Sequence, residues 1–136
     1  MTKTKYIKIL FLILICLCLL SSCSSPGWVT DKTEIIIGES EKFRREEIEQ
    51  AIEVVKKEEN GIYDATLLSV RYDENRAELF VGNYMNSQNI IVLLSDFKTY
   101  RGHVLQESYA EYTDYKWVLN RRDENSEWVL YEEGYG

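Results

Sequence analysis

Residues 43–59 read FRREEIEQAIEVVKKEE and carry the clearest structural signal in the chain. Their apolar side chains follow the i, i+3, i+4, i+7 spacing that places them on one side of a helix: Ile48, Ala51, Ile52 and Val55. Glutamates are concentrated early in this segment and lysines late, as the helix dipole favours. Asn60-Gly61 then supplies a stop signal. The segment therefore predicts an amphipathic helix whose apolar side packs on the rest of the domain.

Strand signals follow this helix. Thr66–Tyr72 alternates, with Leu68, Val70 and Tyr72 on one side, which predicts a strand. The continuous apolar run at 89–97, NIIVLLSDF, predicts a central strand buried on both faces. Residues 112–121 and 127–131 predict a hairpin, and 98–110 a long connection before it.

Two segments are ambiguous. Apolar residues between Glu74 and Met85 recur at helical spacing and predict a second short helix, although Gly82 weakens this interpretation and leaves a strand over 78–81 open. Ile35–Ile37 is either a short edge strand or part of a linker, and we favour the linker. The order of elements predicts one α+β domain over residues 41–136, with the first helix packed on a curved antiparallel sheet.

The N-terminus has the features of an export signal. Basic residues up to Lys8 precede an apolar run at 9–20, which is too short to be a confident membrane span. Leu20-Ser21-Ser22-Cys23 follows and resembles the lipobox of bacterial lipoprotein precursors. We therefore expect a signal peptide at 1–22, cleavage between Ser22 and Cys23, and a lipidated tether at 23–40.

This resemblance implies that the Cys23 thiol carries a diacylglyceryl group and that its amine becomes the mature N-terminus. Two acyl chains anchor a protein firmly, because each buried methylene contributes about 0.8 kcal/mol. The expected location is the cell membrane, with the domain held by the lipid on the extracytoplasmic face. An uncleaved anchor and a plain secreted protein remain the alternatives.

Composition limits the partners. The 136-residue chain has 16 basic and 23 acidic residues, a net charge of −7. Three basic residues and no acidic ones precede Cys23, which leaves 13 basic and 23 acidic residues and a net charge of −10. Such an acidic domain argues against nucleic acid and against electrostatic binding to anionic lipid. The other cysteines, Cys16 and Cys18, lie in the expected signal peptide, so no disulfide is expected in the folded part.

Candidates for catalysis and metal binding are few. His103 is the chain's single histidine, so neither a histidine pair for a metal nor a histidine dyad can form. Asp96 follows one predicted strand and Asp114 lies at the start of another, so their carboxylates could meet as an acid/base pair or cap turns. We favour the turn interpretation, and we expect no catalytic residues, metal or cofactor.

Aromatic residues near the C-terminus are the most suggestive group for ligand binding. Trp117 and Trp128 are expected in the core as cross-strand packing. Tyr109, Tyr112 and Tyr115 are the candidates for a ligand surface, because aromatic faces stack on sugar rings or line apolar pockets.

Three segments together are similar to a family of small, uncharacterised lipoproteins of Gram-positive gut bacteria: EEIEQAIEVVKKE (46–58), NIIVLLSDF (89–97) and YTDYKWVLNRRDENSEWVLYEEGYG (112–136). The resemblance covers most of residues 43–136 and implies an NTF2-like or cystatin-like fold without implying any chemistry. Arg44 departs from the pattern, which has Ser or Thr as the helix cap.

These observations lead to an expected function. We expect a membrane-anchored lipoprotein whose non-enzymatic α+β domain binds a ligand or partner, such as an envelope protein or a glycan. One alternative is an envelope hydrolase or isomerase that uses Asp96 or Asp114. Another is a structural partner in an envelope complex, which would expose an apolar patch.

Overall fold

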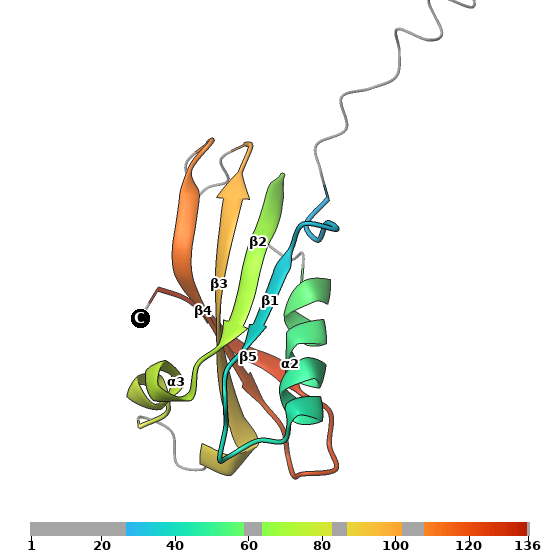
Figure 1. The fold of residues 1–136 in the computed structure, drawn as a ribbon, viewed down its shortest axis with the longest axis vertical. Coiled ribbons are helices and arrows are strands. Elements are labelled where there is room, and N and C mark those ends of the chain that lie inside the picture. The colour runs from blue at the N-terminus through green and yellow to red at the C-terminus, as the bar shows by residue number, and fades with distance from the viewer. Residues whose placement is uncertain (1–26, 59–63, 83–86, 102–107, 136) are drawn as a thin grey trace, which may run out of the picture.

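The computed structural model of the protein describes residues 27–58, 64–82, 87–101 and 108–135, which form a mixed sheet and two helices (Figure 1). The α+β class predicted from the sequence is confirmed at this level. The elements follow in chain order: β1 (Glu34–Ile37), α2 (Arg45–Lys57), β2 (Ala65–Tyr72), α3 (Glu74–Val81), a 3-10 turn (Ser87–Asn89), β3 (Ile90–Thr99), β4 (Glu111–Asn120) and β5 (Val129–Gly134).

The five strands lie in the order β1-β2-β3-β4-β5. β2 to β5 are antiparallel neighbours, whereas β1 runs parallel to β2 and makes the sheet mixed. A parallel pair needs a crossover connection, and α2 lies within that connection. The linker interpretation of Ile35–Ile37 is therefore wrong. These β-branched residues pair with β2 at the sheet edge, where Ile35 and Ile36 each stay 42% exposed.

Residues before β1 also pack on the domain. The Trp28 side chain is buried, and its indole N–H donates to the Val55 carbonyl oxygen at 3.2 Å. The Trp28 backbone carbonyl accepts a hydrogen bond from the Leu67 backbone N–H at 2.7 Å. Part of the segment that we expected to be a tether thus packs on the domain, because Trp28 belongs to the same cluster of buried side chains as Phe43.

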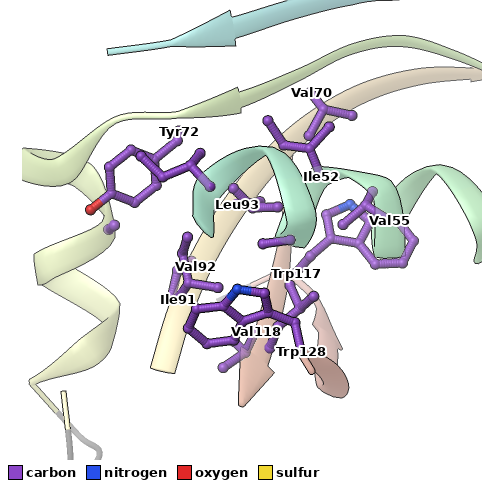
Figure 2. Close-up of a cluster of buried hydrophobic side chains, with 14 of the residues drawn as sticks. Ile52, Val55, Val70, Tyr72, Ile91, Val92, Leu93, Trp117, Val118 and Trp128 are labelled. Atoms are coloured by element: carbon purple, nitrogen blue, oxygen red, sulfur yellow. The ribbon is translucent and has the colours of Figure 1, made fainter. Parts of the chain in front are cut away.

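Helix α2 covers one face of the sheet with its predicted apolar side. Ile48, Ala51, Ile52 and Val55 are all buried. Figure 2 shows the Ile52 and Val55 side chains between the helix and the strands. The helix begins after Arg44, whose side chain has no acceptor for backbone N–H groups. The Glu47 carboxylate instead accepts the Arg44 backbone N–H at 2.8 Å, which supplies half of a capping box.

Adjacent residues of β4 mark the two faces of the sheet, because successive strand side chains point in opposite directions. The Trp117 ring lies in the core on the α2 side, 6.3 Å from the Trp28 ring centroid. The Lys116 ammonium lies 5.5 Å from the Phe80 ring centroid of α3, on the opposite face. The predicted helix over residues 74–85 is confirmed as α3, ending at Val81.

β-Bulges interrupt the strand pairing in three places. The shift between Leu67 and Ser69 breaks the strict alternation expected for β2. Leu67 therefore joins Val70 and Tyr72 in the core, and Leu68 is only half-buried. The prediction that Leu68 shares the face of Val70 is wrong for this reason. Bulges bend and twist the strands that carry them.

Candidate functional site

Three tyrosines lie together at one end of the sheet. Tyr115 and Tyr112 belong to β4, and Tyr135 follows the end of β5. The Tyr135 ring centroid is 5.4 Å from that of Tyr115 and 6.1 Å from that of Tyr112. Phe97 of β3 supports them, stacked on Tyr112 at 4.9 Å and edge-on to Tyr115 at 5.2 Å. We call Tyr112, Tyr115 and Tyr135 the tyrosine surface.

The members of the tyrosine surface differ in exposure. Tyr135 is 58% exposed, whereas Tyr112 and Tyr115 are half-buried. Burial, with the nearby negative charge of Glu133, raises the pKa of Tyr115 to about 12. Burial and repulsion by Glu58 also raise the pKa of Glu133. At neutral pH the Tyr115 phenol therefore remains a neutral hydrogen-bonding group.

The structure joins two of the three predicted ligand-surface tyrosines. Tyr112 and Tyr115 both lie on β4 and both contact the Tyr135 ring. Tyr109 lies in the turn before that strand, with a left-handed backbone (φ 59°) and 75% exposure. Among the described residues, no ring contact links it to the tyrosine surface. Tyr135 was missed because it follows the last predicted strand. Strict alternation from Leu130 would have placed Tyr135 on the opposite face, and only the bulge between Val118 and Leu119 in the β4–β5 pairing brings it to the face of Tyr115.

The carboxylates of Asp96 and Asp114 also lie close together, and two arginines bind them. Arg71 of β2 binds both carboxylates, with its guanidinium 2.7 Å from Asp96 Oδ2 and in contact with Asp114 Oδ1. Arg76 of α3 holds Asp114 in a second, bidentate pair at 2.8 and 3.0 Å. Asp114 lies in the bulge opposite Asp96 and has a left-handed backbone (φ 56°). The Asp114 backbone N–H donates to Asp96 Oδ1 at 2.9 Å.

These contacts keep both carboxylates ionised. Burial alone would raise the pKa of Asp96, but hydrogen bonds from Arg71, the Asp114 N–H and Ser69 outweigh it and lower that pKa. The Arg76 and Arg71 guanidiniums lower the pKa of Asp114. An acid/base pair needs one carboxylate poised to carry a proton near neutral pH. The geometry instead favours a structural ion cluster that joins β2, β3, β4 and α3.

Replacing Asp96 by Asn is expected to lower the free energy of unfolding by about 2 kcal/mol at pH 7, because charge-assisted hydrogen bonds to Arg71 are lost. The pKa of Asp96 is lower in the folded state, so this stabilisation is present above the unfolded pKa of about 3.9 and disappears as the pH falls through the folded value. Urea unfolding at pH 7 and pH 3 measures it. If Asp96→Asn lowers the free energy of unfolding by the same amount at pH 7 and pH 3, the ion cluster is contradicted.

A shallow groove of about 600 Å³ lies between α2 and the β4–β5 loop. Its acidic groups Glu47 and Glu53 are paired with Arg121 and Lys56. Glu124 and Glu127 line the same groove, and we assign no ligand to it. It is lined by Arg44, Glu47, Gln50, Glu53, Val54, Lys57, Glu124, Asn125, Ser126, Glu127 and Trp128.

Several predicted sites lie outside the described residues: Ser22, Cys23 and His103. In the ranges that the structure describes, no group of three or more His, Cys, Asp or Glu side chains is placed to hold a metal ion. Neither described helix is long and apolar enough to cross a membrane. No protein-family profile, curated protein or solved structure matches the chain.

Proposed function

We propose that this chain is a lipoprotein anchored through Cys23 to the extracytoplasmic face of the cell membrane, and that its domain binds a ligand or partner without catalysing a reaction. Support for the anchor comes from the signal features at 1–22 and the lipobox-like Leu20–Cys23. Support for binding comes from the tyrosine surface. Phenols held on a rigid sheet offer large contact area at low entropic cost.

One observation carries the binding part of this proposal. Tyr135 keeps 58% of its surface exposed although it lies within 5.4 Å of the Tyr115 ring. The enzymatic alternative has less support, since Asp96 and Asp114 are both engaged by arginines. We therefore place recognition at the tyrosine surface.

The finer fold and family assignments belong to the same proposal. A long helix across one face of a bulged sheet is compatible with an NTF2-like or cystatin-like domain, although the parallel strand β1 is an addition to the antiparallel sheet expected for it. The resemblance to small Gram-positive lipoproteins rests on segments within 46–58, 89–97 and 112–136.

Replacing Tyr135 by Ala is expected to weaken binding about tenfold, because truncating an aromatic anchor costs 1–2 kcal/mol or more. Full-length protein in detergent micelles would be tested for retention on immobilised cell-wall glycan and on immobilised envelope protein. Tyr131→Ala is the matched control, since Tyr131 lies on β5 and is 60% exposed. Equal retention of the two variants on every probe would refute the tyrosine surface as the binding site.

A further inference from the structure

Glu133 of β5 carries a negative charge that no other described residue neutralises. Its carboxylate has no hydrogen-bond or ion-pair partner in the ranges that the structure describes, whereas the adjacent Glu132 pairs with Lys116 at 2.8 Å. Burial and repulsion by Glu58 raise the pKa of Glu133, in contrast to Asp96, whose pKa is lowered by hydrogen bonds despite its burial. Glu133 is therefore placed for a cation that the folded domain does not supply.

The strand register places Glu133 beside the aromatic side chains of β4. Glu133 pairs with Trp117, and directly opposed residues of antiparallel strands share one face of the sheet. The Trp117 ring centroid lies 5.4 Å from that of Tyr115, which in turn lies 5.4 Å from that of Tyr135. After burial, the negative charge of Glu133 is the largest cause of the raised pKa of Tyr115. The carboxylate and the tyrosine surface can therefore contact the same ligand.

Tyr135 presents an aromatic face to this ligand. Such a face attracts a cation that lies within about 6 Å of the ring centroid. The domain uses this attraction elsewhere, because the Lys116 ammonium lies 5.5 Å from the Phe80 ring centroid. The Arg121 guanidinium likewise lies 4.4 Å from the Trp128 ring centroid. Among the described residues, no lysine or arginine lies over the ring of Tyr135, which is 58% exposed and open to a cation from solution.

The segments outside the described ranges cannot bring a lysine or an arginine to this site. Residues 59–63, 83–86 and 102–107 contain neither amino acid, and two glutamates in them add negative charge. The one base in these segments is His103, and an unperturbed histidine is mostly neutral at pH 7. These segments therefore offer no lysine or arginine to balance Glu133.

The described basic residues are engaged or lie elsewhere. Most of them form ion pairs with acidic side chains. Of the others, Lys32 precedes β1 at the far edge of the sheet, and Lys57 lines the groove beside the β4–β5 loop. Lys98 follows Phe97 on β3, so its side chain points to the face opposite the tyrosine surface. A cation at the tyrosine surface must therefore come from a ligand.

We propose that the tyrosine surface binds a ligand that carries an alkylated ammonium group, with Tyr135 against its alkyl groups and Glu133 beside its charge. This inference rests on the proposed function, since it names the class of ligand for the surface assigned there. Alkyl groups on the nitrogen contact the ring face and weaken hydration, whereas a primary ammonium is strongly hydrated. A divalent metal ion would need more oxygen ligands than Glu133 alone supplies.

A matched pair of small molecules tests the role of charge. Choline and 3,3-dimethyl-1-butanol have nearly the same shape, but choline has a positively charged nitrogen where the alcohol has a neutral carbon. Full-length protein in non-ionic detergent micelles would be titrated with each molecule at pH 7, and saturation-transfer NMR of the methyl signals would give both dissociation constants. Micelles without protein provide the correction for binding to detergent.

We expect choline to bind about fivefold more tightly than the neutral alcohol, which corresponds to about 1 kcal/mol for a cation over an exposed ring. Tyr135→Ala should abolish this preference. Glu133→Gln should weaken choline binding about threefold at low salt, because a nearby charge is lost, and should not affect the alcohol. Glu132→Gln changes the net charge equally on the opposite face and should leave choline binding unchanged.

Equal affinity of the wild type for the two molecules, or equal weakening by Glu133→Gln and Glu132→Gln, would overturn the ammonium assignment. Glu133→Gln removes no hydrogen bond within the described ranges, so we expect it to fold, and urea unfolding at pH 7 checks this. If Tyr135→Ala still loses retention on glycan or envelope protein, the tyrosine surface remains a binding site for another class of ligand. If Tyr135→Ala changes neither choline binding nor retention, the proposed binding function is overturned as well.

Discussion

The Arg121→Met variant is expected to unfold with a free energy about 3–5 kcal/mol lower than that of the wild type. Arg121 and Glu47 form an ion pair at 2.7 Å, with side-chain exposures of 5% and 10%. Methionine keeps much of the apolar stem but leaves the Glu47 carboxylate buried without its cation. Removing one partner of a buried pair costs more than the pair itself contributes.

The pair joins elements that are distant in sequence. Glu47 lies in the first turn of α2, and Arg121 follows β4. The Arg121 guanidinium also lies 4.4 Å from the Trp128 ring centroid, and the Trp128 indole donates to the Glu47 carbonyl at 3.0 Å. Burial acts to raise the pKa of Glu47, but hydrogen bonds from the Arg44 N–H and Arg121 lower it. The helix start and the β4–β5 hairpin are thus held by one charged contact.

Urea unfolding at pH 7 measures the Arg121→Met effect, and two further variants interpret it. Glu47→Gln combined with Arg121→Met should recover at least about 1 kcal/mol, because glutamine is neutral and can still cap the Arg44 N–H. Arg45→Met removes an exposed pair with Glu49 and should cost no more than about 0.5 kcal/mol. The burial argument fails if Arg45→Met and Arg121→Met lose the same stability.

Local patterns predict most of the elements of this fold. The spacing of apolar residues is sufficient to predict α2 and its buried side. The four predicted residues are all buried: Ile48, Ala51, Ile52 and Val55. The apolar run at 89–97 is sufficient to predict the central strand β3, in which residues 91–95 are buried. Both patterns involve residues that are close in sequence, so they can be recognised without knowledge of the tertiary structure.

Contacts between distant residues could not be predicted in the same way. Glu47 and Arg121 are 74 residues apart, and each looks like an ordinary surface charge in its own segment. Ile35–Ile37 becomes a strand only because β2 offers a parallel edge. The turn-capping role that we favoured for Asp96 and Asp114 is wrong, because both lie within strands, and the arginines that bind them were not foreseen. Arg71 lies on the neighbouring strand, and its register was unknown before the structure.

The Cys23→Ala substitution is expected to have the largest effect of all, because it removes the thiol to which the lipid would attach. Two acyl chains contribute about 0.8 kcal/mol for each buried methylene, so their loss should convert a firmly held protein into one released from the membrane. Cys18→Ala is the matched control, since that thiol lies within the expected signal peptide.

Labelling of living cells with a radioactive fatty acid tests the central claim most directly. We predict that the immunoprecipitated wild-type protein and Cys18→Ala both carry the label, and that Cys23→Ala carries none. Label that persists in Cys23→Ala, or a wild-type protein that carries no label at all, would contradict a lipid-anchored binding domain.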